Sequence, residues 1–173
     1  MKDGEPDGLA ITWHENGQKL SEANFKEGKA HGLAITWYEN GQKQRESNFE
    51  KGNQHGLEIA YFENGITAGK AEFKNGLQHG KVLRWHENGL LMAHSHFKED
   101  KPHGLFTSWY SNGQKQSNAT WVDGKIVSGV GWKPNGEQCP ETNIVDGSGI
   151  AITYKLDGTV EKRNEFMKGL LHY

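Results

Sequence analysis

The sequence repeats itself with a period of 24 residues. Residues 8–19 read GLAITWHENGQK and return at 32–43 as GLAITWYENGQK, and the pattern continues to residue 127 before two less regular units. The seven units run approximately over 8–31, 32–55, 56–79, 80–103, 104–127, 128–148 and 149–172. Short similar units bury their apolar faces by stacking on their neighbours. We therefore expect a single repeat domain over residues 1–173, in which 1–7 looks like the tail of a preceding unit.

Each unit has the pattern of a β-hairpin. In the first unit apolar and polar residues alternate, so that Leu9, Ile11 and Trp13 fall on one face of a strand. An Asn-Gly pair follows in six units, and this pair favours a type I′ turn, in which both central residues have positive φ. A second glycine, Gly28 in the first unit, marks the reversal into the next unit. The pattern predicts an all-β protein, an elongated antiparallel meander or solenoid of about seven 24-residue hairpin repeats with two strands each.

The composition excludes several classes of protein. Glycine supplies 23 of the 173 residues and hydrophobic residues 34%, so the fold needs a thin core in which glycine and aromatic residues replace aliphatic ones. The single cysteine, Cys139, leaves no disulfide framework and no cysteine-rich zinc site. A formal net charge of −2 provides no basic excess for nucleic-acid binding. No apolar run is long enough for a membrane-spanning helix, and the first residues lack the apolar stretch of a signal peptide.

Two aromatic columns recur at fixed places in the units. The first stands four residues before the turn glycine: Trp13, Trp37, Tyr61, Trp85, Trp109, Trp132 and Tyr154. The second stands eight residues after it: Phe25, Phe49, Phe73, Phe97, Trp121, Ile144 and Phe166. Because a single hairpin is marginally stable, we expect stacking to turn these positions into buried ladders.

A third column comes one residue after the first and therefore faces the opposite side of the sheet. It is the candidate partner-binding site: His14, Tyr38, Phe62, His86 and Tyr110. Two alternatives stay open. Either the sheet curls and packs this column inside a groove, or the column is an aromatic strip that a partner protein contacts. Variable positions on the polar face that would supply specificity are Gln44, Arg45, Ala68, Met92 and Gln116.

The histidines suggest a metal site at first sight, because five of them occupy equivalent positions: His31, His55, His79, His103 and His172. Equivalent residues in successive hairpins are about 9.6 Å apart, too far to share a metal. We expect these side chains to bond to local backbone ahead of a glycine with special dihedral angles. His94 and His96, with His86 nearby, form a denser cluster, where a weak metal or pH-sensitive site is the alternative.

Nothing in the sequence has the pattern of a catalytic centre. No serine lies in a nucleophile elbow, Cys139 has no recurrent base beside it, and no glycine opens a helix as a phosphate-binding loop would. The acidic residues before the Asn-Gly turns are expected to be solvated hairpin ends. We therefore expect no enzyme, no catalytic residue, no metal and no cofactor.

Residues 25–32, which read FKEGKAHG, are followed by a strand and the Glu-Asn-Gly turn at 39–41, and together they resemble the variant form of the MORN (membrane occupation and recognition nexus) repeat. The resemblance covers about 165 residues. The repeat spacing and the Glu-Asn-Gly turn are similar to those of bacterial YwqK-family antitoxins. It implies a non-enzymatic binding protein, an antitoxin or immunity protein that neutralises a bacterial toxin by direct binding. The alternative, suggested by other MORN proteins, is a scaffold or membrane-peripheral adaptor. The last two units depart from the pattern at 132–134 and 137–140, where proline is expected to break the strands.

The expected partner is a protein, which is a toxin in the leading interpretation. Exposed edge strands would also allow self-association. The near-neutral charge gives little support to binding of anionic lipid, so membrane association rests on the family resemblance. We expect a cytoplasmic location, unless a signal or a lipid anchor precedes residue 1.

Overall fold

The computed structural model describes residues 5–172, and in that range it has seventeen strands and no helix. Strands that follow one another in the chain pair antiparallel, so the predicted all-β meander is confirmed. The chain divides into two compact units, unit 1 (Met1–Gly80) and unit 2 (Lys81–Tyr173), and each is described by itself. The expectation that 1–7 is the tail of a repeat concerns residues 1–4 in part, and these lie outside the described residues.

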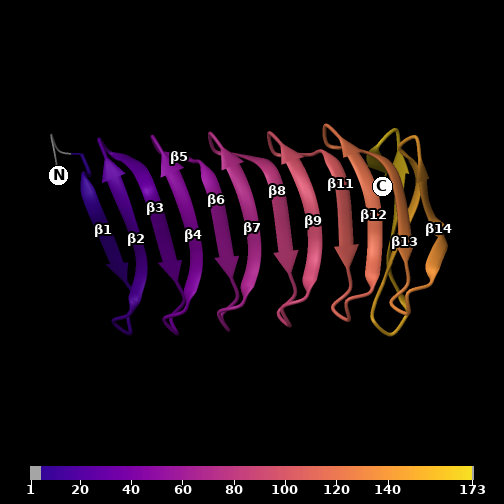
Figure 1. Ribbon diagram of the computed structural model, residues 1–173, viewed down its shortest axis with the longest axis horizontal. Coiled ribbons are helices and arrows are strands. Elements are labelled where there is room, and N and C mark those ends of the chain that lie inside the picture. Colours follow the sequence, from indigo (N-terminus) through magenta and orange to yellow (C-terminus); the bar gives the residue numbers. More distant parts are fainter. Residues whose placement is uncertain (1–4, 173) are drawn as a thin grey trace. The chain divides into compact units, whose positions relative to one another are not determined.

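Unit 1 is a series of antiparallel hairpins (Figure 1). Its strands are β1 (Gly8–Trp13), β2 (Lys19–Lys26), β3 (Lys29–Trp37), β4 (Lys43–Glu50), β5 (Asn53–Gln54), β6 (Gly56–Tyr61) and β7 (Thr67–Lys74), and β8 (Leu77–Trp85) begins here and continues into unit 2. The main contacts within unit 1 join strands that are neighbours along the chain. Each hairpin therefore buries its side chains chiefly against the hairpins on either side of it.

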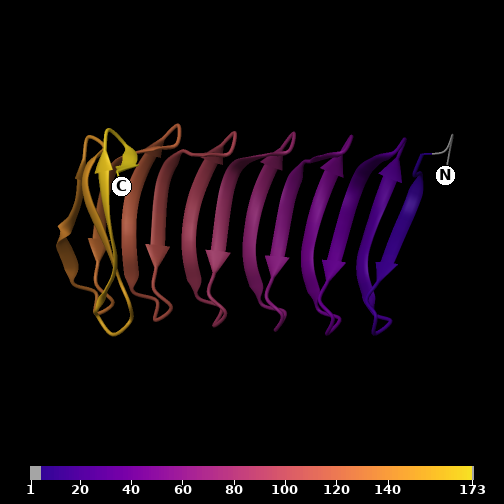
Figure 2. The same ribbon diagram turned by 180° about the vertical axis from the view of Figure 1, so that it is seen from behind.

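Unit 2 continues the same pattern and then folds back on itself. Its further strands are β9 (Leu91–Lys98), β10 (Lys101–Pro102), β11 (Gly104–Trp109), β12 (Lys115–Val122), β13 (Lys125–Trp132), β14 (Gln138–Val145), β15 (Ser148–Tyr154), β16 (Val160–Met167) and β17 (Leu170–His172). In Figure 2 the yellow strands at the end of the chain lie in front of the orange strands β13 and β14. Contacts between β13 and β15 agree with this second layer.

Two strands in each of seven units would give fourteen strands; β17 after the last reversal adds one, and the other two have a local cause. The pairs β5–β6 and β10–β11 are each one strand interrupted at a histidine, His55 and His103. At both places the histidine N–H donates to a carbonyl of the preceding strand, that of Asn48 and that of His96. The strand β3 passes through the same position without a break. The interruptions are therefore small distortions of the predicted hairpin and leave its pairing intact.

The turn geometry differs from the prediction. Positive φ occurs at Gly17 but not at Asn16, so the Asn-Gly turns are not type I′. The N–H of Gly17 donates to the carbonyl of His14 at 3.0 Å, which closes a four-residue turn whose last residue is the left-handed Gly17. Paired positive φ values occur instead at the opposite turns, for example 51° at Glu27 and 72° at Gly28. The two-residue type I′ signature therefore belongs to the second reversal of each repeat.

Strand pairing gives the sheet of unit 1 two chemically different sides. The side that we call the Ala/Ser face carries Ala10, Ser21, Ala23, Phe25, Ala34, Thr36, Arg45, Ser47, Phe49, Glu58, Ala60, Ala71 and Phe73. The other side, the Leu/Ile face, carries Leu9, Ile11, Leu33, Ile35, Leu57 and Ile59. Ser47 and Ala71 are buried on the first face, whereas Leu9, Leu33 and Leu57 are 56%, 44% and 43% exposed on the second. Small side chains therefore line the more crowded face.

The aromatic ladders are less buried than predicted. The first column is half-buried from Trp37 to Trp132 and buried at Tyr154, but Trp13 is 57% exposed, so the prediction is wrong there. The ammonium of Lys19 lies 5.5 Å from the ring centre of Trp37, and that of Lys115 lies 5.0 Å from Trp132. A lysine of the preceding hairpin thus covers part of the ring in the next one.

In unit 2 the strands that fold back onto the sheet form a hydrophobic core, which a single layer of hairpins lacks. One buried cluster is Tyr110, Cys139, Ile152 and Tyr154. A second is Ala119, Ile126 and Ile144, with Phe106, Trp121, Ala151 and Phe166 packed around it. In both clusters residues of β15 or β16 meet one side of β11 to β14. That side carries Phe106, Ser108, Ser117, Ala119 and Gly129, and we call it the Ala/Ser face of unit 2. The most buried side chain among the described residues is that of Cys139, which is 1% exposed.

The sheet of unit 2 bends back on itself in the irregular sixth unit, residues 128–148. Gly129 and Gly131 lie on the Ala/Ser face of β13, and a Cβ at Gly131 would come within 2.8 Å of Thr142 Cγ2. The absence of side chains lets β14 approach β13 closely. Pro140 was expected to break the strand, but it lies within β14, where the pairing shifts between Val130 and Gly131 and leaves it outside the ladder. A proline in a bulge costs no ladder hydrogen bond, so the strand continues.

Candidate protein-binding surface

The predicted partner-binding column lies at the start of the Asn-Gly turns, and its polar side chains bond to the next repeat. In each case a ring nitrogen or hydroxyl donates to the carbonyl of the Trp or Tyr one repeat further on. The contacts are His14 Nε2 to Trp37 O at 2.9 Å, Tyr38 Oη to Tyr61 O at 2.8 Å, His86 Nε2 to Trp109 O at 3.0 Å and Tyr110 Oη to Trp132 O at 2.8 Å. These four side-chain contacts, which we call rungs, link successive hairpins, so the column has an internal structural role.

Two members of the column show how its surroundings change along the chain. Phe62 has no hydroxyl and is half-buried. Tyr110 is 5% exposed and packs against Cys139 and Tyr154, and burial raises the pKa of its phenol. Packing inside the fold, one of the two alternatives from the sequence, therefore describes Tyr110. Contact of His14, Tyr38, Phe62 and His86 with a partner stays a prediction.

A second ladder runs along the same turns and was missed from the sequence. The turn asparagines accept a bond from the N–H two residues on, and in four repeats the amide also donates to a carbonyl of the next turn. In the second repeat, Asn40 Oδ1 accepts from Gln42 N and Asn40 Nδ2 donates to Glu63 O, both at 2.9 Å. The same donor contact occurs from Asn16, Asn88 and Asn112. The sequence signal for this ladder was the recurrence of Asn at a turn position that Asp or Gly could also occupy. Of these three residues, only Asn has a side chain that both accepts and donates hydrogen bonds.

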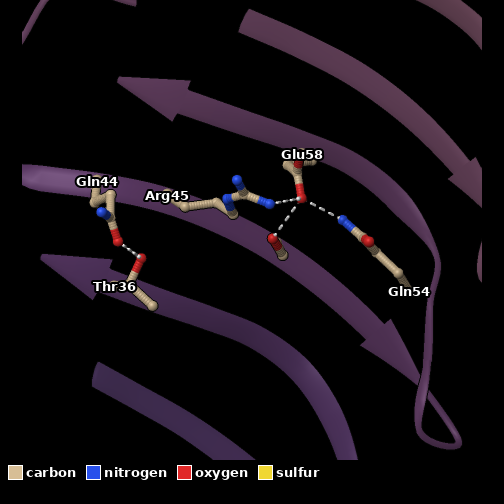
Figure 3. Close-up of polar contacts among 6 residues, drawn as sticks. Thr36, Gln44, Arg45, Gln54 and Glu58 are labelled. Carbon is tan, nitrogen blue, oxygen red and sulfur yellow. Dashed lines mark hydrogen bonds and ion pairs between the residues drawn. The ribbon is translucent and has the colours of Figure 1, made fainter. Parts of the chain in front are cut away.

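A polar network interrupts the Ala/Ser face of unit 1, and Figure 3 shows its residues converging from β4, β6 and the β5 segment. Glu58 Oε2 accepts from Gln54 Nε2 at 2.6 Å, Ser47 Oγ at 3.1 Å and Arg45 Nη1 at 3.4 Å. The Glu58 side chain is 15% exposed and that of Arg45 is 56% exposed. The carboxylate is thus held by neighbours while the guanidinium reaches solvent. Arg45 is one of the positions predicted to supply specificity.

Aromatic rings lie beside this network. Phe25, Phe49 and Phe73 are half-buried on the Ala/Ser face, each opposite a glycine of the partner strand. An aromatic ring covers the backbone that a glycine leaves open. Within unit 1 the main strand contacts run only along the sheet, so this face has no second layer of strands on it in residues 5–80. The face combines rings, small side chains and a charged pair, which are the components of protein interfaces.

The histidine column shows no site that would hold a metal. The glycines that follow it have positive φ, for example 77° at Gly32 and 86° at Gly104. His103 Nδ1 accepts from Asp123 N at 3.4 Å, which is a contact with the backbone of the next repeat and not the local contact that was predicted. The rings of His94 and His96 lie 5.0 Å apart, and burial lowers the pKa of His94. Within residues 5–172 no three His, Cys, Asp or Glu residues are grouped so as to bind a metal ion.

The buried cysteine takes part in a polar contact of the core. Cys139 Sγ lies 3.1 Å from Tyr154 Oη, and this contact, with burial, raises the pKa of Tyr154 to about 12. Burial opposes ionisation of Cys139, but hydrogen bonds with Tyr154 and Thr142 outweigh it, so the pKa of the thiol is lowered. Because Cys139 is 1% exposed, the thiol is closed to any substrate from solvent.

The repeats match a known family. A model described as the MORN repeat variant matches residues 6–27, 30–51, 54–75, 78–99 and 102–123, which is more than half of the chain. The chain belongs to the MORN repeat variant family. No curated protein sequence matches it significantly. MORN repeats identify a repeat-based binding or scaffold protein. Within the described residues, no helix has the length and apolar character needed to cross a bilayer.

Proposed function

We propose that this MORN repeat protein is a non-enzymatic antitoxin or immunity protein, which neutralises a bacterial toxin by binding it directly. The observation that carries the proposal is the open Ala/Ser face of unit 1, where Phe25, Phe49 and Phe73 flank the Arg45–Glu58 pair. In this proposal the protein acts in the cytoplasm and uses no cofactor. The toxin contacts the rings through apolar groups and the exposed Arg45 through an acidic group.

Within each repeat, the residues that hold the hairpins together differ from those that face solvent, and this separation supports such a role. The rungs of the turn edge, such as Tyr38 to Tyr61 at 2.8 Å, and the asparagine ladder fix the spacing of the hairpins. Backbone pairing fixes their register. Exposed residues between the two turn edges, such as Arg45, take no part in the rungs or the asparagine ladder. A surface that varies position by position on a fixed frame suits recognition of one cognate protein.

A scaffold or membrane-peripheral adaptor is the second candidate, because one observation favours it. The Leu/Ile face of unit 1 exposes a row of leucines, at 56% for Leu9, 44% for Leu33 and 43% for Leu57. An apolar row of this kind suits contact with a second copy or with the interfacial region of a membrane. The two functions use opposite faces of the same sheet, so variants of one face separate them.

Capture followed by reconstitution tests the antitoxin function. The tagged full chain is used to isolate a protein from a lysate of the source organism, and that protein is then co-expressed with the chain in a growth assay. We expect a stoichiometric complex and restored growth with the wild type, and loss of both with Glu58→Lys, which places a second cation beside Arg45. Glu63→Lys is the matched control, since its exposed side chain lies in a turn.

The outcomes separate the two functions. Recovery of anionic lipid or of the same chain alone, together with loss of that recovery in Leu33→Ser, would favour the scaffold. Growth rescue that survives Glu58→Lys would show that the Ala/Ser face is not the binding surface. Circular dichroism of each variant checks that the strands are retained, and Arg45→Glu is the second variant if Glu58→Lys does not fold.

A further inference from the structure

Unit 2 contains a cleft of 440 Å³ that the proposed function does not use. Its walls come from two layers. Residues of β9, β11 and β12 form one side, and Thr153 of β15, the strand that folds back, contributes to the other. A cleft lined from two layers and of this volume is in the range of small-molecule sites, whereas a stretch of bare sheet is not.

The lining is apolar and rich in rings. Phe97, Phe106 and Trp121 contribute aromatic side chains, and Met92 and Pro102 add apolar surface. Offset stacking and edge-to-face packing favour an aromatic ligand in such a site over an aliphatic one of equal size. Met92 can adapt to its shape because the side chain is unbranched.

Besides Arg84, the polar side chains of the lining are Ser95, His96, Ser108, Gln116, Ser117 and Thr153. Ser108 Oγ donates to Gln116 Oε1 at 3.1 Å and lies 2.7 Å from Ser117 Oγ, so these three side chains already satisfy one another. Met92 and Gln116 are two of the positions that the sequence singled out as variable. None of these three bonded side chains brings a charge to the cleft.

Arg84 is the permanently charged side chain of the lining, which also contains the titratable His96. Arg84 lines the cleft, its side chain is exposed, and it forms no ion pair within residues 5–172. No aspartate or glutamate is among the lining residues. An unpaired guanidinium beside an apolar site complements an anion, and its planar fork fits a carboxylate through two parallel hydrogen bonds.

We propose that this cleft binds a small aromatic carboxylate. The ring of the ligand lies among Phe97, Phe106 and Trp121, and its carboxylate accepts hydrogen bonds from the guanidinium of Arg84. The cleft and its lining lie wholly in unit 2, and the proposed toxin-binding face lies in unit 1. The two proposals therefore stand or fall separately.

The test compares two ligands that differ in charge alone. Naphthalene-2-carboxylate and its neutral isostere naphthalene-2-carboxamide are titrated into the full chain by isothermal calorimetry at pH 7.5. We expect saturable 1:1 binding of both, with the carboxylate about fivefold tighter, because a solvent-exposed charge contact is worth about that factor. Arg84→Gln should remove the difference between the ligands and leave the affinity for the carboxamide unchanged.

Two further variants make the test specific. Arg163→Gln removes the same charge from unit 2 at a side chain that is 60% exposed, lies 3.7 Å from Glu141 and does not line the cleft, so it should leave both affinities unchanged. Gln116→Trp fills the cleft and should abolish binding of both ligands. The proposal is overturned if no saturable binding occurs, if both ligands bind equally to the wild type, or if R163Q weakens carboxylate binding as much as R84Q. The comparison of R84Q with R163Q decides the question even if Gln116→Trp does not fold.

Discussion

The close approach of β14 to β13 predicts that two glycines on one strand respond very differently to alanine. Gly129 and Gly131 are both buried on the Ala/Ser face of β13, and neither has a positive φ. A Cβ at Gly131 would meet Thr142 at three atoms, Cγ2 at 2.8 Å, Cβ at 3.0 Å and Oγ1 at 3.1 Å. A Cβ at Gly129 would meet first the terminal Cδ1 of Ile144, at 3.2 Å. The first contact is against a short branched side chain, and the second is against the end of a flexible one.

The expected magnitudes follow from what each neighbour can do. Thr142 cannot retreat easily, because its Oγ1 accepts from Ile152 N at 2.9 Å and donates to Ile152 O at 3.3 Å. Overpacking at such a site costs about 1–3 kcal/mol, and alanine recovers about 0.5 kcal/mol by restricting the unfolded chain. We expect Gly131→Ala to lower the free energy of unfolding by about 2 kcal/mol. Gly129→Ala should stay within about 0.5 kcal/mol of the wild type, since Ile144 can change rotamer.

Urea denaturation followed by tryptophan fluorescence and circular dichroism measures both variants. A double-mutant cycle with Thr142→Ser sharpens the test, because serine removes Cγ2, the closest atom, and keeps the hydroxyl. In the Gly131→Ala background this change should cost less than in the wild type, with a coupling of about 1 kcal/mol. Equal losses for the two glycine variants, or no coupling to Thr142, would refute the assignment of β13 and β14 as the corner of the sheet.

Three other predictions concern the rungs, the asparagine ladder and the half-buried His94. Tyr38→Phe removes the bond to Tyr61 O and should lower the free energy of unfolding by about 1 kcal/mol in urea denaturation, and an unchanged midpoint would contradict this. Asn40→Ala removes the turn bond and the bond to Glu63 O, so it should cost about 1–2 kcal/mol in the same assay, more than Asn40→Asp, which keeps the turn bond. Burial lowers the pKa of His94 below its ordinary 6.5, so the unfolded chain binds the proton more tightly and stability is lost as the pH falls through 6.5. His94→Gln should flatten that loss between about pH 5 and 7 in thermal melts, and an identical pH profile would count against it.

Much of the local structure could be predicted because it depends on neighbouring residues alone. Alternation at Leu9, Ile11 and Trp13 places a strand, and the spacing of glycines places its turns. The predicted turn type was wrong because an Asn-Gly pair is compatible with more than one type of turn. Which type forms depends on the contact that the Asn16 side chain makes. That side chain bonds to Glu39 in the next repeat, a contact that a pattern within one hairpin does not contain.

The candidate column shows the same limit. Its five positions recur in the sequence, but the sequence could not say what their polar atoms would meet. The acceptors are carbonyls one repeat away, for example Trp37 O for His14. The Arg45–Glu58 contact spans two strands, and only Arg45 stood out beforehand as a variable position. The cleft in unit 2 was not expected at all.

A 24-residue period and alternating apolar residues are properties of neighbours along the chain, so the repeat length, the antiparallel hairpins and the columns of aromatic residues can be read from the sequence. The folding of the sheet of unit 2 onto its own Ala/Ser face at Gly129 and Gly131 emerges from the three-dimensional structure. That fold-back buries Cys139 and Tyr154 and brings Thr153 to the cleft lined by Arg84. The physical reason is that which face is covered depends on contacts between strands far apart in the chain, and no periodicity within a repeat encodes those contacts.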